Sequence, residues 1–96
     1  MYARVAAFEG GDTERIRQMN DERRQQEGWM PEGVKRVLVL NDEQGGKRLF
    51  ITFFDSEEAV EAASQTFEQM GDDIPEDVRG RRTSVGVYEV LGDESV

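Results

Sequence analysis

The feature of the sequence that most constrains its fold is a strand-like segment, residues 48–54, that is apolar on both sides. Successive side chains of a strand point to opposite faces. One face of this segment would carry Leu49, Ile51 and Phe53. The other would carry Phe50, Thr52 and Phe54. Because a sheet that is solvated on one face alternates apolar and polar residues, we expect both faces of this strand to be covered.

Turn and capping residues divide the rest of the chain into alternating elements. Gly10-Gly11 ends a first strand, Asp12 or Thr13 can cap a first helix, and Gly28 can end it. Gly45-Gly46 predicts a hairpin. The predicted strands span residues 2–8, 34–40, 48–54 and 83–91.

The second helix, which runs to Gly71, opens with a predicted capping box, in which Asp55 and Glu58 satisfy each other's backbone donors. Residues 72–82 are predicted to be a loop. The order strand-helix-strand-strand-helix-strand predicts a ferredoxin-like α+β fold, a four-stranded antiparallel sheet with both helices on one face. We expect a single domain over residues 1–92 and a frayed tail at 93–96.

Two helices on one face leave the other face of this sheet without a cover. Exposed apolar patches of several residues favour aggregation, and a second copy related by a two-fold axis is the simplest cover. We therefore predict a homodimer. The candidate interface residues are Leu38, Leu40, Phe50, Thr52 and Phe54.

Composition excludes several classes of protein. The chain has 96 residues, a net charge of −9, no cysteine and no histidine. The acidic excess argues against a nucleic-acid surface, and no apolar run is long enough to span a membrane. We expect a soluble cytoplasmic protein without a metal site, since the acidic residues 72–77 do not match a calcium loop. A solvated surface is favoured there, with a basic partner or a divalent cation as the alternatives.

The segment ITFFDSEEAVEAA, residues 51–63, resembles the junction of the third strand and second helix in the dimeric α/β-barrel superfamily, especially antibiotic-biosynthesis-monooxygenase-like domains. The resemblance implies a homodimer with a cavity between sheet and helices in each subunit. Some members oxygenate quinol-like polyketide intermediates without metal or flavin, so no cofactor is expected. Others degrade haem with a histidine ligand and an asparagine on the first strand. Haem degradation is disfavoured here, because the chain has no histidine and carries Val5, Ala6 and Ala7 at the strand.

The first helix turns polar on its inward side after Met19, which suggests a polar site inside the predicted cavity. The candidate cavity residues are Arg4, Asn20, Arg23, Trp29 and Tyr88. Simpler alternatives stay open for several of them. Asn20 and Arg23 could be solvated residues of a loosely packed helix, and Trp29 could be a hydrophobic plug.

A second basic group, Arg79, Arg81 and Arg82, precedes the last strand. It could clamp an anion or gate the cavity, or it could pair with the preceding acids. Lys47 and Arg48 are interpreted as residues that keep the hairpin soluble. The favoured function is non-catalytic binding of a small hydrophobic or aromatic molecule. The alternative is a cofactor-independent monooxygenase acting on a quinol- or polyketide-like aromatic substrate.

Overall fold

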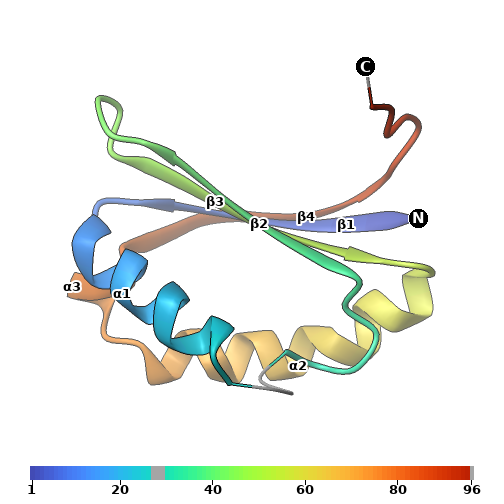
Figure 1. The fold of residues 1–96 in the computed structure, drawn as a ribbon, viewed down its shortest axis with the longest axis horizontal. Coiled ribbons are helices and arrows are strands. Elements are labelled where there is room, and N and C mark those ends of the chain that lie inside the picture. The colour runs from blue at the N-terminus through green and yellow to red at the C-terminus, as the bar shows by residue number, and fades with distance from the viewer. Residues whose placement is uncertain (27–29, 96) are drawn as a thin grey trace.

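The computed structural model describes residues 1–26 and 30–95, without the side chains of residues 71–73. The described part of the chain forms four strands, two long helices and one short helix (Figure 1). In chain order these are β1 (Tyr2–Glu9), α1 (Thr13–Arg24), β2 (Arg36–Asp42), β3 (Lys47–Phe54), α2 (Glu57–Asp73), α3 (Glu76–Arg79) and β4 (Arg81–Glu89).

The four strands form one antiparallel sheet in the order β2-β3-β1-β4. The helices lie together on one side of this sheet, and the opposite side carries none of them (Figure 1). The predicted ferredoxin-like fold is confirmed. Two strand predictions were shifted by about two residues, because β2 begins at Arg36 and β4 at Arg81.

The strand register decides which side chains face the helices. Ala6 on β1 lies opposite Phe50 on β3, which lies opposite Val39 on β2. This row belongs to the helix side, because all three residues line a cavity together with residues of α1 and α2. One position along, the row of Val5, Ile51 and Leu38 therefore belongs to the open side.

This register corrects the predicted dimer interface. The prediction combined residues of both faces. Leu38 and Leu40 share the open side with Ile51, whereas Phe50 lies on the helix side. Thr52 and Phe54 are both 0% exposed and cannot meet a second subunit across the open face.

The core is small and depends mainly on α2. Its main cluster is Phe54 on β3 with Val60, Ala63 and Phe67 on α2, and Ala3 and Ala6 on β1 are buried as well. The Phe67 ring packs edge-on against the rings of both Phe50 and Phe54. In contrast, α1 has no buried residue at all. The first helix is therefore not packed tightly onto the sheet.

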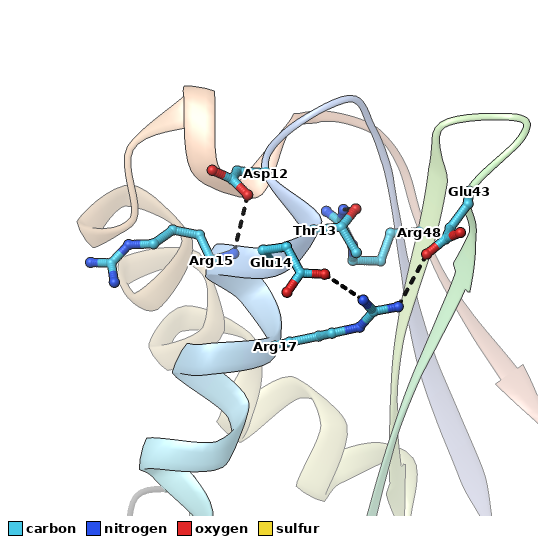
Figure 2. A network of polar contacts seen from close by, with 7 residues as sticks. All are labelled: Asp12, Thr13, Glu14, Arg15, Arg17, Glu43 and Arg48. Carbon is cyan, nitrogen blue, oxygen red and sulfur yellow. Dashed lines mark hydrogen bonds and ion pairs between the residues drawn. The ribbon is translucent and has the colours of Figure 1, made fainter.

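The two long helices begin with different caps. Asp12 caps α1, as predicted, since its side chain accepts a hydrogen bond from the Arg15 backbone N–H at 3.1 Å (Figure 2). The second cap differs from the prediction. Ser56 Oγ accepts from the Ala59 backbone N–H at 3.2 Å, while Asp55 instead pairs with Lys35 at 3.6 Å.

Segments from opposite ends of the chain touch where β1 turns into α1. The Asp12 backbone N–H donates to the Val78 carbonyl at 2.8 Å. Gly11 and Gly80 both have positive φ, and a Cβ on either would lie 2.6 Å from backbone atoms of the opposing turn. Only glycine fits there. The opposing turn contains Gly80, directly after the short helix α3, whose residues were predicted to be a loop.

One residue of the predicted tail, Asp93, lies near the far edge of the sheet. Asp93 forms an ion pair with Arg36 at 3.8 Å, although β4 and β2 are the two edge strands. Arg36 in turn lies over the Phe53 ring at 5.6 Å. Residues 90–93 therefore extend from one edge of the sheet toward the other. No helix in the described ranges is long and apolar enough to cross a membrane.

Candidate functional site

A cavity of about 410 Å³ lies between the sheet and the helices. The loose packing of α1 leaves this space open above β1 and β3. Much of its lining is apolar and comes from both the strands and the helices. These residues are Ala6, Phe8, Ile16, Met19, Val39, Phe50, Phe67, Met70 and Ile74.

The polar part of the lining is unexpectedly basic for a chain of net charge −9. Six arginines but only two glutamates are among the described lining residues. The arginines are Arg4, Arg23, Arg48, Arg79, Arg81 and Arg82, and the glutamates are Glu68 and Glu76. The cavity thus combines an apolar surface with a local excess of positive charge.

One carboxylate serves two of these arginines. Glu68 Oε1 accepts from Arg82 at 2.6 Å and from the buried Arg4 at 3.3 Å. The Arg4 guanidinium also lies 5.0 Å from the centre of the Phe67 ring. The hydrogen bond from Arg82 is the main reason that the pKa of Glu68 is lowered. Burial lowers the pKa of Arg4, and the Glu68 carboxylate opposes that effect.

Arg48 is a buried cation with neutral partners. It is 7% exposed, and its Nη atoms donate to the Arg79 carbonyl at 3.3 Å and to Thr13 Oγ1 at 3.0 Å. Figure 2 shows Arg48 and Thr13 together, beside the start of α1. Arg48 Nε is buried and has no hydrogen-bond partner. Burial lowers the pKa of Arg48, and the charge of Asp12 partly offsets this.

The interpretation of Arg48 as a residue that keeps the hairpin soluble was therefore wrong. Arg48 lies on the same face of β3 as Phe50, Thr52 and Phe54, because these residues are spaced two apart along the strand. That parity was visible in the sequence, but the position of Arg48 beside a hairpin suggested exposure. The neighbouring Lys47 is exposed.

Arg79 resembles Arg48 in its surroundings. Its Nε is also buried without a hydrogen-bond partner, and its positive charge contributes to the lowered pKa of Glu68. Because Arg48 donates to the Arg79 carbonyl, the two residues lie side by side. One region of the cavity wall therefore holds two guanidinium groups whose Nε atoms have no hydrogen-bond partner.

The other two arginines of the predicted loop cluster pair with acids distant in sequence. Arg82 pairs with Glu68, and Arg81 pairs with Glu9 at 3.1 Å. All three members of the cluster line the cavity. The side chains of Asp72 and Asp73, the first of the acids considered as partners, lie outside the described residues.

Three of the five predicted cavity residues line the cavity, namely Arg4, Asn20 and Arg23. Trp29 lies outside the described residues. Tyr88 was placed wrongly. It lies opposite Ala3 on β1, whereas its neighbour Val87 lies opposite Arg4. Tyr88 therefore belongs to the open side of the sheet, where it is 60% exposed.

A polar network between α1 and the β2–β3 hairpin lies outside the lining of the cavity. Arg17 lies between Glu14 on the same helix and Glu43 in the β2–β3 hairpin (Figure 2). These hydrogen bonds raise the pKa of Arg17. All three side chains are exposed, and exposed pairs contribute little to stability. The network links α1 to the hairpin without contributing a chemical group to the site.

The described residues offer no cluster of metal ligands. Among the described residues, no three His, Cys, Asp or Glu side chains are grouped so that they could hold a metal ion.

Comparison with solved structures relates this architecture to known proteins. An antibiotic-biosynthesis-monooxygenase-like protein from Chloroflexus aurantiacus has a TM-score of 0.60 at 14% identity, over 98% of this chain and 96% of that one. A variant of MhuD with two manganese protoporphyrin IX molecules per active site has a TM-score of 0.60 at 13% identity, over 100% of both chains. A similar protein from Deinococcus radiodurans has a TM-score of 0.51 at 16% identity, over 100% of this chain and 98% of that one.

Comparison of the sequence alone does not relate the chain to a known family. No family model and no curated protein matches the chain. The similarity is thus one of three-dimensional arrangement, over nearly the whole length of each chain. The chain has the ferredoxin-like fold of antibiotic-biosynthesis-monooxygenase-like proteins, and the predicted resemblance to them is confirmed at the level of the fold.

Proposed function

We propose that the chain binds a small aromatic molecule in the cavity between the sheet and the helices. The observation that carries this proposal is the cavity itself. Its volume of about 410 Å³ lies within the range of small-molecule sites, roughly 300–1,000 Å³. The rings of Phe50 and Phe67 stand edge-to-face in its wall, and aromatic ligands pack well against such surfaces.

A structural neighbour supports this proposal. The MhuD variant holds two manganese protoporphyrin IX molecules per active site, so this fold can accept flat aromatic molecules. The chain has no histidine that could ligate a haem iron. We therefore favour a metal-free aromatic ligand.

The first test is native mass spectrometry of the purified protein, followed by titration with the neutral fluorescent probe N-phenyl-1-naphthylamine. We expect retained ligand mass or saturable probe binding. Met19→Trp should fill the cavity and weaken probe binding about tenfold or more, since Met19 lines the cavity wall. The matched control is Gln18→Trp, one residue away on the exposed side of α1. No binding, or equal binding by both variants, would contradict the proposal.

The monooxygenase alternative rests on Asn20 and Arg23, which both line the cavity. An amide and a guanidinium can stabilise the oxyanion of a deprotonated quinol or anthrone. Oxygen uptake on a panel of quinols and anthrones tests this alternative. Turnover that Asn20→Leu removes would favour an enzyme, and no uptake by a protein that binds the probe would favour a binding function.

We also propose that the chain forms a homodimer through the open face of the sheet. Leu40 and Tyr88 are exposed on that face, at 47% and 60%. Leu38 and Ile51 lie between them and are half-buried. A second copy would cover this apolar surface.

A further inference from the structure

We propose that Arg48 and Arg79 form an anion-binding subsite, and that the ligand is consequently an aromatic acid rather than a neutral aromatic molecule. This inference rests on the proposed function, because it assigns a chemical class to the ligand of the same cavity. It differs from the predicted hydrophobic ligand in requiring a negative group at a defined place.

The first observation is that both guanidinium groups have hydrogen-bonding capacity that the protein does not use. Arg48 Nε and Arg79 Nε are buried without a partner. An N–H that is removed from water and left unpaired is destabilising. A carboxylate can accept from such donors, and its bonds to guanidinium are shorter and stronger than those between neutral groups.

The second observation is the charge balance around the two residues. Arg48 donates to a carbonyl and a hydroxyl, which carry no net charge. The charge of Asp12 acts on the pKa of Arg48, but the two side chains form no ion pair. Among the described residues, no carboxylate contacts Arg48 to neutralise its charge.

Arg79 is in a similar situation, because no carboxylate among the described side chains forms an ion pair with it, although Glu76 of α3 also lines the cavity. Glu68 Oε1 is shared by Arg4 and Arg82, and Glu9 pairs with Arg81. Arg79 acts on Glu68 only through its field. Arg48 and Arg79 are thus two cationic groups of the cavity wall that no described carboxylate contacts.

The third observation is the apolar surface next to this pair. Phe50 follows Arg48 by two residues on the same face of β3, which corresponds to roughly 7 Å along the strand. Phe8 lies directly opposite Arg48 on β1 and also lines the cavity. A ligand with an aromatic body near Phe50 and a carboxylate near Arg48 has the dimensions of a two-ring aromatic acid. A free inorganic anion would leave the apolar part unused.

The test compares 2-naphthoate with its neutral isostere 2-naphthamide, as competitors of the neutral probe N-phenyl-1-naphthylamine at pH 7. We expect the acid to bind at least about tenfold more tightly than the amide, the usual scale for a charged hydrogen bond. That preference should shrink as salt is added. Arg48→Met and Arg79→Met keep much of the apolar stem and should each reduce the preference to within about threefold.

Arg15→Met is the matched control, because Arg15 is exposed on α1 and donates to Gln18 outside the cavity. It should keep the full preference for the acid. The wild-type comparison needs no variant, so the test still decides if Arg48→Met does not fold.

The outcomes separate the two levels of the proposal. Equal binding of acid and amide overturns the anion subsite and leaves the proposed aromatic site standing. Binding of neither, together with no binding of the probe, overturns both. Loss of the preference in Arg15→Met as well would show a general effect of charge and overturn the assignment to Arg48 and Arg79.

Discussion

Two arginines, Arg4 and Arg48, are buried beneath the helices, where a cation is destabilising unless it is hydrogen-bonded. They are stabilised in different ways. Arg4 has the carboxylate of Glu68 and the face of Phe67, so its charge is compensated within the protein. Arg48 has a carbonyl and a hydroxyl, so its charge is not. This difference is the reason that we propose Arg48, and not Arg4, as the arginine that contacts a ligand.

Replacing Glu68 by Gln should destabilise the protein in a pH-dependent way. The pKa of Glu68 is lowered in the folded state, mainly by Arg82. Its contribution is therefore complete above the ordinary glutamate pKa of about 4.3 and is lost as the pH falls through the lowered value. Solvent screens the half-exposed carboxylate, so we expect a loss of about 1 kcal/mol at pH 7.

Urea unfolding of wild type and Glu68→Gln at pH 7 and pH 3 measures this effect. The difference between the two proteins should be largest at pH 7 and smaller at pH 3. Glu61→Gln, an exposed change on the same helix, is the control and should have little effect at either pH. A difference that grows toward low pH would contradict the prediction.

At the level of elements, the two long helices have unequal roles. Among the described residues, the second helix supplies three of the six buried apolar core residues, Val60, Ala63 and Phe67. The first helix supplies none and instead places Ile16, Met19 and Asn20 along the cavity. Stability should therefore depend on α2, while α1 should tolerate changes that alter the cavity.

The start of α2 provides a test of this dependence. Ser56→Ala removes the side-chain cap of the helix and should lower the free energy of unfolding by about 1 kcal/mol. Asp55→Ala removes only the exposed pair with Lys35 and should cost less than about 0.5 kcal/mol. Thermal or urea unfolding of the two variants measures the difference. A larger loss for Asp55→Ala would support the capping box predicted from the sequence.

The sequence predicted the elements better than their faces. Long periodic segments and the Gly45-Gly46 hairpin signal were sufficient for the strand and helix order. The short helix α3, with four residues, is too short to show a period. The error at Tyr88 has a different cause. Residue parity within β4 does not reveal how β4 aligns with β1, and a register shift between Ala7 and Phe8 interrupts that pairing.

At the scale of the whole molecule, the sheet separates two surfaces of different chemistry. The helix side encloses a basic, apolar cavity, and the open side presents apolar side chains such as Ile51 and Leu38. Part of the polar cavity lining was predictable, because Arg4, Asn20 and Arg23 follow from helix and strand periodicity. Arg79 was considered as part of an anion clamp, but the contribution of Arg48 beside it was not, because it depends on two segments that meet only after the chain has folded.

Ile51→Lys should convert the proposed homodimer to a monomer. Ile51 lies opposite Val5 and Leu38, in the middle of the open face, where a charge would be costly to bury against a second subunit. Size-exclusion chromatography with light scattering at micromolar concentration measures the mass. Gln65→Lys, exposed on α2, is the control and should remain a dimer. A monomeric wild type would contradict the proposed dimer, and a dimeric Ile51→Lys would exclude this interface.

The contact between Gly11 and Gly80 has a consequence for how this protein can diverge. The two turns meet through main-chain atoms, so their positions do not depend on neighbouring side chains. Arg79 and Arg81 flank Gly80 in sequence. Point mutations at these two arginines can therefore change the charge of the cavity while the backbone that carries them stays in place. Single substitutions at the two arginines can therefore change which ligand is preferred. Gly11 and Gly80 cannot be substituted in the same way, because a side chain there would clash with the opposing backbone.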